Sequence, residues 1–170
     1  MLCWGLVLLA ALSIIAVAFL PECVSLVWHV RFGQAVQFRA YLIPVPWPWW
    51  AFRGAADDLV VQRMRRGDPD ADSEIMIYPL DPRIGHEVAI ESYENALANR
   101  TVLEGYAETG RNIATASGSS ATCVEFTSTK RGGTVAAKCV ALSVGLRLDF
   151  VGRPAELHVL YDIMKSIRKS

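Results

Sequence analysis

Residues 121–151 read ATCVEFTSTKRGGTVAAKCVALSVGLRLDFV. Apolar and polar side chains alternate along this stretch, most clearly over Leu146–Phe150, and a period of two is typical of a β-strand with one buried face. The pattern predicts three strands over Thr122–Ser128, Thr134–Ala141 and Gly145–Val151. Because the links between them are short, we expect neighbouring strands to pair antiparallel.

Two cysteines lie in the first two of these strands, on either side of the turn Lys130–Gly133. If Lys130–Gly132 form a three-residue hairpin loop, the register places Cys123 directly opposite Cys139. Opposed cysteines on antiparallel strands come within reach of a disulfide. The alternatives are two buried free thiols or a redox or metal site, and no histidine lies nearby to complete a zinc site. The pattern favours a structural disulfide, which indicates an oxidising compartment.

A helix is predicted to follow, from Pro154 to Lys169. Proline suits the first position of a helix, and the acidic Glu156 in the first turn complements the helix dipole. Apolar side chains recur at helical spacing along one narrow stripe, which we expect to pack on the sheet. The stripe consists of Leu157, Leu160, Ile163, Met164 and Ile167.

The element order of this C-terminal third, three strands joined by turns and then a helix ending in Tyr161–Ile167, resembles the end of a PsbP-like α/β domain. The resemblance rests on the order of elements and involves no diagnostic motif. It implies an α/β fold of a kind that hosts unrelated accessory and adaptor roles.

Upstream, the alternation of side chains predicts strands in pairs. Trp28–Phe32 and Val36–Leu42 are expected to form a hairpin around the three-residue loop Gly33–Ala35, which places both apolar rows on one face. Two further strands are predicted at Leu59–Met64 and Glu74–Tyr78.

The middle of the chain is predicted to contain a helix over Gly85–Ala98, a strand over Val102–Thr109 and a small-residue loop over Arg111–Ala121. The fold class is therefore α+β, with a mainly antiparallel sheet and two covering helices. Residues 25–170 are long enough for a single domain of this kind.

An uncharged apolar run, Leu2–Leu20, precedes this domain. About 20 apolar residues suffice to span the hydrocarbon core, so residues 1–24 are predicted to form a retained transmembrane anchor. The alternative is a cleaved signal peptide, for which Ala16–Ala18 offers a small-x-small site. The basic residues Arg31 and Arg39 favour a cytoplasmic domain. The predicted disulfide favours an extracytoplasmic domain, periplasmic in a bacterium, and we give the disulfide more weight.

A cluster of tryptophans, Trp47, Trp49 and Trp50, lies in the proline-rich segment that follows Tyr41. Such a cluster can form a stacking surface for sugars, a patch for a protein partner, or an aromatic belt at a membrane surface. Alternatively, the three side chains fold back and cover the core. These tryptophans are the candidate residues for contact with a ligand or partner.

Charged residues support neither nucleic-acid binding nor catalysis. Seventeen basic and seventeen acidic residues cancel, so the chain lacks the basic field that nucleic-acid binding needs. Carboxylates that could serve an enzyme, Glu104, Glu125 and Asp149, are scattered along the predicted strands, and no histidine has ligand or triad spacing. The acidic run Asp68–Glu74 lacks the glycine and glutamate of a calcium loop. No metal and no cofactor is predicted.

The sequence thus predicts a membrane-anchored, extracytoplasmic accessory or interaction protein of the cell envelope, without catalytic activity. Its expected partners are the membrane and another envelope or membrane protein. One alternative is a module that binds a small ligand or glycan through Trp47–Trp50, and a second is an enzyme of unknown class.

Overall fold

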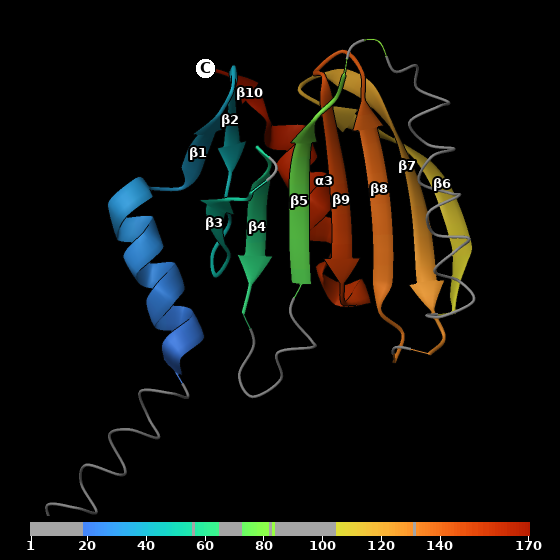
Figure 1. The fold of residues 1–170 in the computed structure, drawn as a ribbon, viewed down its shortest axis with the longest axis horizontal. Helices are drawn as coiled ribbons and strands as arrows, with labels where there is room; N and C mark the ends of the chain where they lie inside the picture. The colour runs from blue at the N-terminus through green and yellow to red at the C-terminus, as the bar shows by residue number, and fades with distance from the viewer. Residues whose placement is uncertain (1–18, 56, 65–72, 82, 84–104, 131) are drawn as a thin grey trace, which may run out of the picture.

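The computed structural model describes residues 19–55, 57–64, 73–81, 83, 105–130 and 132–170. This part of the chain combines two β-sheets with the helical residues 19–32 and a C-terminal helix (Figure 1). The strands are β1 (Ala35–Phe38), β2 (Tyr41–Pro44), β3 (Trp50–Arg53), β4 (Leu59–Arg63), β5 (Ser73–Pro79), β6 (Tyr106–Ala116), β7 (Ser119–Ser128), β8 (Val135–Ala141), β9 (Leu146–Gly152) and β10 (Arg168–Lys169). A short 3₁₀ helix, η2 (Pro154–Glu156), leads into α3 (Leu157–Ser166).

The larger sheet has the strand order β3-β4-β5-β9-β8-β7-β6, and the smaller sheet has the order β1-β2-β10. Each of these pairings is antiparallel. The predicted α+β class with a mainly antiparallel sheet is therefore confirmed. The predicted strands at Leu59–Met64 and Glu74–Tyr78 correspond to β4 and β5, and the three strands of residues 122–151 correspond to β7, β8 and β9.

The main core lies between the larger sheet and α3, which runs behind β5 and β9 in Figure 1. Alternate residues of the strands face α3, because successive side chains of a strand point to opposite faces of the sheet. The predicted apolar stripe of α3 faces them, although Leu157 is only half-buried. Fully buried side chains of this core include Ile75, Ile77, Leu148, Phe150, Leu160, Ile163 and Met164.

Pairing of β7 with β8 follows the register predicted from the hairpin turn. Cys123 lies opposite Cys139, with Val124 opposite Lys138, and the two cysteines form a disulfide with an S–S distance of 2.00 Å. Gly132 and Gly133 in the turn take positive φ angles of 58° and 80°, which glycine adopts at little cost. The predicted disulfide is confirmed, and it is buried on the face of the sheet that α3 covers.

The predicted hairpin of Trp28–Phe32 with Val36–Leu42 is wrong, because residues 19–32 are helical. Ser25 and Trp28 are both buried, and residues three apart share a face of a helix but not of a strand. The Ser25 hydroxyl donates to the Trp49 carbonyl at 3.1 Å, and the Trp28 indole N–H donates to the Ala51 carbonyl at 2.7 Å. The helical period is not evident in the sequence because a run of five residues fits a strand and a helix turn equally well.

The predicted strand Val36–Leu42 is instead interrupted by a turn, and its two halves belong to two short strands that pair with each other. β1 pairs with β2 across a tight turn at Arg39 and Ala40, with Val36 opposite Ile43 and Arg39 at a φ of 54°. β3, which begins within the proline- and tryptophan-rich segment, was not predicted.

The predicted loop at Arg111–Ala121 is also wrong. β6 continues through Ala116 with a bulge between Glu108 and Gly110, and only Ser117 and Gly118 form the turn into β7. β6 pairs with β7 alone at the edge of the sheet, and most of its side chains are exposed. An edge strand with exposed, small and polar side chains shows no apolar alternation, so its sequence pattern resembles a loop.

The predicted helix at the C-terminus is shorter than expected. It ends at Ser166, because Ile167 has an extended ψ of 131°, and Arg168 and Lys169 form β10, which pairs with β2. The predicted helix over Gly85–Ala98 lies outside the described residues, as do residues 1–18 of the predicted anchor. Among the residues described, no helix has the length and apolar content needed to cross a membrane.

Candidate functional site

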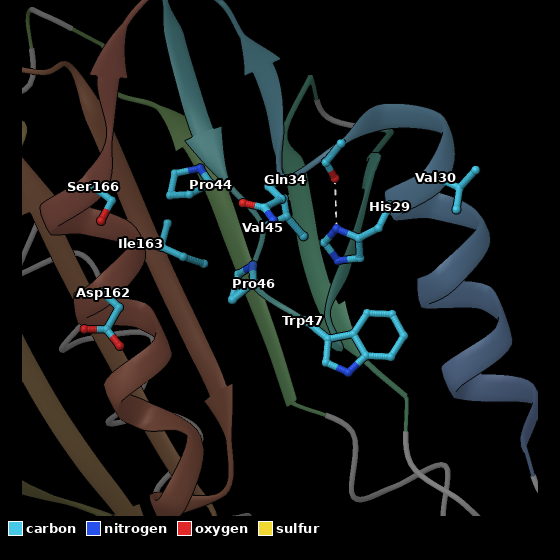
Figure 2. Close-up of a pocket in the computed structure, with 11 residues that line it drawn as sticks. His29, Val30, Gln34, Pro44, Val45, Pro46, Trp47, Asp162, Ile163 and Ser166 are labelled. Atoms are coloured by element: carbon cyan, nitrogen blue, oxygen red, sulfur yellow. Dashed lines mark hydrogen bonds between the residues drawn. The ribbon is translucent and has the colours of Figure 1, made fainter.

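A groove of about 690 Å³ opens between the helical residues 19–32, the segment Pro44–Trp47 and α3. Figure 2 shows side chains of the three segments around one hollow, with Ile163 on one side and His29 and Trp47 on the other. Its volume falls in the range of about 300–1,000 Å³ that is usual for sites of small ligands. The residues that line it are His29, Val30, Gly33, Gln34, Pro44, Val45, Pro46, Trp47, Asp162, Ile163 and Ser166.

The segment after β2 explains why the groove has an aromatic wall. Pro46 and Pro48 supply no amide donors, so the sheet ladder does not continue beyond Val45, whose amide donates to the Gln34 carbonyl at 2.9 Å. The Trp49 amide donates to the Pro46 carbonyl at 2.8 Å, which closes a turn around a cis peptide bond between Trp47 and Pro48. Trp47 is exposed beside this turn and lines the groove, whereas Trp49 is buried.

The structure separates the three candidate tryptophans. Trp49 is 1 % exposed and belongs to the main core, whereas Trp47 is 56 % exposed and lines the groove. Trp50 begins β3 and packs against Phe52, with ring centroids 5.2 Å apart. Covering the core is thus the role of Trp49, and only Trp47 is placed to contact a ligand or partner in the groove.

His29 connects the end of the helical segment to the tryptophan turn. Its Nδ1 lies 2.8 Å from the Gly33 carbonyl oxygen, and its Nε2 lies 3.0 Å from the Trp49 carbonyl oxygen. A neutral imidazole has one N–H and can donate to one of these oxygens, whereas the imidazolium ion donates to both. The ring lies 5.7 Å from that of Trp47. Because the alternation over residues 28–32 predicts a strand with His29 at the surface, the sequence gives no sign of this contact.

Side chains of α3 form the opposite wall. Ile163 is almost fully buried and supplies apolar surface, while Asp162 and Ser166 are exposed at the rim. The groove is therefore apolar at its base and carries a few polar groups at its edge, an arrangement that suits binding. The helical spacing of Asp162, Ile163 and Ser166 could have shown that they share one side of a helix, but not which segments they face.

A smaller hollow of about 320 Å³ lies beside the same tryptophan turn, with Trp47 and Trp49 in its wall. Arg63 and Glu156 meet there, with a distance of 2.7 Å between Arg63 Nη1 and Glu156 Oε1. This ion pair joins the end of β4 to the start of the C-terminal helical region. Both side chains line the hollow, and the groove is the larger of these two openings beside Trp47.

Of the carboxylates considered for catalysis, the two that the structure describes, Glu125 and Asp149, do not converge. Glu125 lies on the face of the sheet that α3 covers, where it accepts hydrogen bonds from the Tyr161 hydroxyl and, at 2.9 Å, from the Asn112 amide. Burial, reinforced by the hydrogen bond to Glu125, raises the pKa of Tyr161 above its usual range. Asp149 lies on the opposite face of the same sheet. Glu104 lies outside the described residues.

Lys138 and Asp149 face each other on the side of the sheet remote from α3, where both are buried. Burial lowers the pKa of the Lys138 ammonium to about 8, against the attraction of Asp149. Burial also raises the pKa of Asp149, although Arg147 pairs with it at 3.1 Å. Arg147 in turn lies over the Tyr78 ring, 4.2 Å from its centroid. These groups interact with one another on this face of the sheet and do not line the groove.

Comparisons with known proteins find a similar fold among solved structures. The sequence matches no protein-family model and no curated protein. The solution structure of cyanobacterial PsbP (CyanoP) from Synechocystis sp. PCC 6803 is similar to this chain, with a TM-score of 0.48 and 11 % sequence identity. The match covers 77 % of this chain and 87 % of that chain. The predicted resemblance to PsbP is confirmed. A similarity at this level carries no information on function.

Within the described residues, no group of histidine, cysteine, aspartate or glutamate side chains is arranged to hold a metal ion. Of the acidic run Asp68–Glu74, only Ser73 and Glu74 are described, and both belong to β5.

Proposed function

We propose that this protein is a membrane-tethered, extracytoplasmic accessory domain that acts by binding another protein of the envelope in the groove beside Trp47. The observation that carries the proposal is the groove itself. It is open, its base is apolar, and an exposed tryptophan forms one wall. Tryptophan is among the residues that most often dominate the energy of protein–protein contacts.

The proposed compartment rests on the disulfide between Cys123 and Cys139. Structural disulfides persist in oxidising compartments and are rare in the cytoplasm. The proposed tether rests on the uncharged run Leu2–Leu20. The domain boundaries that follow are residues 1–24 for the anchor and residues 25–170 for the domain.

Thiol mapping in the native host tests the compartment. The denatured, unreduced full-length protein is treated with an alkylating reagent and digested, and the peptides are analysed by mass spectrometry. We expect Cys23 to be alkylated, because it is an exposed free thiol, and Cys123 and Cys139 to be recovered as a linked pair. Full alkylation of both Cys123 and Cys139 would contradict an extracytoplasmic domain.

Site-specific photo-crosslinking in the native host tests the groove. Gln34 is exposed and lines the groove, and Gln37 is an equally suitable exposed glutamine that does not line it. A benzophenone amino acid at Gln34 is expected to give a discrete crosslinked band, and the same replacement at Gln37 is expected to give a weaker one. The band at Gln34 should lose most of its intensity when Trp47→Ala is added. Equal crosslinking from both glutamines, or no effect of Trp47→Ala, would argue against the groove as the binding site.

A second candidate function is the binding of a small ligand or glycan in the same groove, which its volume of about 690 Å³ favours. Native mass spectrometry of the full-length protein released from membranes distinguishes the two. A small molecule that co-purifies with the native protein and is lost in Trp47→Ala would favour the ligand, whereas a crosslinked polypeptide favours the partner.

A further inference from the structure

The outer side of the helical residues 19–32 carries only apolar side chains and a cysteine as far as Val30. Exposure recurs at helical spacing, so these residues form one face pointing away from the sheets. We call it the outer face, and it consists of Phe19, Leu20, Cys23, Leu26, Val27 and Val30. A helix packed on a water-soluble domain normally has charged and polar residues on that side.

The polar residues of the same segment lie elsewhere. Ser25 is buried, His29 is half-buried against the tryptophan turn, and Glu22 is half-buried as well. The helical segment is thus apolar on the side that faces outward and holds its polar groups against the domain. Water is a poor solvent for such a face, and an exposed apolar surface of this kind marks a site of contact.

We infer that the outer face lies in the lipid bilayer, so that the domain is held against the membrane surface by the side of this helix. The inference rests on the proposed function, because it assumes the tether. The sequence indicates that lipid, and not a protein, covers the outer face, because the uncharged run Leu2–Leu20 leads directly into it. A segment that enters the bilayer carries the residues that follow it into contact with the same lipids.

The far end of the helical segment has the composition expected at a membrane–water interface. Arg31 is exposed and is the first basic residue of the chain, apart from His29, and its guanidinium lies 5.3 Å from the centroid of the Phe32 ring. Arginine extends its charge toward phosphate groups while its stem covers apolar surface. Trp47, exposed beside His29, adds a residue type that is enriched at this depth.

The contacts of the helix with the domain set the depth of insertion. Ser25 and Trp28 donate hydrogen bonds to Trp49 and Ala51, so the inner side of the helix stays on the protein. A helix held in this way lies in the interface with its apolar side about 5–10 Å below the headgroups. From Phe19 to Arg31 the segment extends about 18 Å, at 1.5 Å per residue. The mouth of the groove, at Val30 and Trp47, then lies at the membrane surface.

Depth-dependent quenching on the full-length protein tests this placement. The chain with Cys3→Ser and Cys23→Ser is reconstituted into palmitoyl-oleoyl phosphatidylcholine vesicles, and one new cysteine carries a bimane fluorophore. Val30→Cys reports on the outer face, and Ile113→Cys on β6 is the matched control, because the two native side chains are 81 % and 83 % exposed. We expect lipids with brominated acyl chains to quench the label at Val30 at least twofold more than the label at Ile113. Iodide, which is dissolved in the water, should quench the label at Ile113 more than the label at Val30.

The outcomes separate the inference from the proposed function. If the protein floats with the vesicles and both labels respond alike to brominated lipid and to iodide, the tether stands and the inference fails. If the label at Val30 is shielded from iodide but is not quenched by brominated lipid, a protein surface covers the outer face and the inference fails. If the protein does not float with the vesicles, the tether of the proposed function fails, and the inference fails with it.

Discussion

Trp47 and Trp49, two positions apart, lie in opposite environments, because the prolines around them end the sheet and reverse the chain. Trp49 is enclosed in the core, while Trp47 remains exposed at the groove. A large side chain that is fully buried contributes to stability, and an exposed one is available for binding. One turn therefore places one tryptophan in the core and the other in the proposed binding groove.

Replacing each tryptophan by alanine should show this separation. Trp49→Ala is expected to lower the free energy of unfolding by about 3–5 kcal/mol, because it leaves a large cavity in the core. Trp47→Ala is expected to change it by less than about 1 kcal/mol. Denaturant titration of the full-length protein in mild detergent measures both values. Similar losses at the two positions would mean that Trp47 also packs in the core.

The lowered pKa of Lys138 predicts that the stability of the protein depends on pH. Its pKa in the folded protein is lowered to about 8, so between about pH 8 and its ordinary value near 10.5 the unfolded chain holds the proton and the folded chain does not. The free energy of unfolding should therefore rise with pH in this window, by up to about 1.4 kcal/mol per pH unit. Below about pH 8 the lysine is charged in both states and contributes no slope.

The control for this prediction is Lys138→Met, which removes the titrating group and leaves Asp149 paired with Arg147. Denaturant titrations at about pH 7.5 and about pH 9.5, with the free cysteines replaced by serine, give the comparison. We expect the stability of the parent chain to rise relative to that of the variant. Parallel pH profiles for the two chains would show that Lys138 keeps its ordinary pKa in the fold.

At the scale of elements, α3 connects the two sheets. Its buried side covers the disulfide-bonded hairpin of β7 and β8, and the chain then leaves the helix at Ile167 to add β10 to the smaller sheet. The same helix supplies one wall of the groove through Ile163. Both the fold and the groove therefore depend on the packing of α3 against the sheet.

Leu160→Ala tests that packing. Leu160 is fully buried on α3, and truncation of a buried leucine costs about 2–5 kcal/mol. An exposed position on the same helix, His158→Ala, is the control and should cost less than about 0.5 kcal/mol. Both variants are measured by denaturant titration. A loss below about 1 kcal/mol for Leu160→Ala would show that α3 is peripheral to the core.

At the scale of the whole molecule, the groove and the outer face adjoin each other within the described part of the chain. Val30 belongs both to the outer face and to the lining of the groove. If the domain lies against the bilayer as inferred, a partner reaching the groove approaches along the membrane. This arrangement favours a partner that is itself held in the membrane.

Retention of the N-terminal segment is the prediction at this scale. Because Leu2–Leu20 is uncharged and long enough to span the hydrocarbon core, we expect it to remain attached in the mature protein. Intact-mass and N-terminal peptide analysis of the protein from native membranes measures this. A mature N-terminus at Phe19 or later would identify a cleaved signal peptide, and the protein would then be recovered in the soluble extracytoplasmic fraction.

Local patterns were sufficient for the β7–β8 hairpin and for α3, but not for the hairpins β1–β2 and β6–β7, although those also join neighbours in the chain. The turn at Gly132 and Gly133 sets the register of β7 and β8, so the pairing of Cys123 with Cys139 follows from the amino-acid sequence alone. The stripe of α3 is likewise a repeat within one helix. The hairpin register depends on a turn between residues that are close in sequence. The stripe of α3 is long enough for its helical period to be distinguished from the period of two of a strand.

Contacts between distant segments could not be derived in this way. The helical state of residues 19–32 depends on Trp28 and Ser25 reaching the carbonyl groups of Ala51 and Trp49, and β10 depends on an edge offered by β2. A short apolar run fits either a period of two or a period of 3.6, so its state is settled by the surface on which it packs. The groove has the same origin, because its walls come from three segments that only the packed chain brings together.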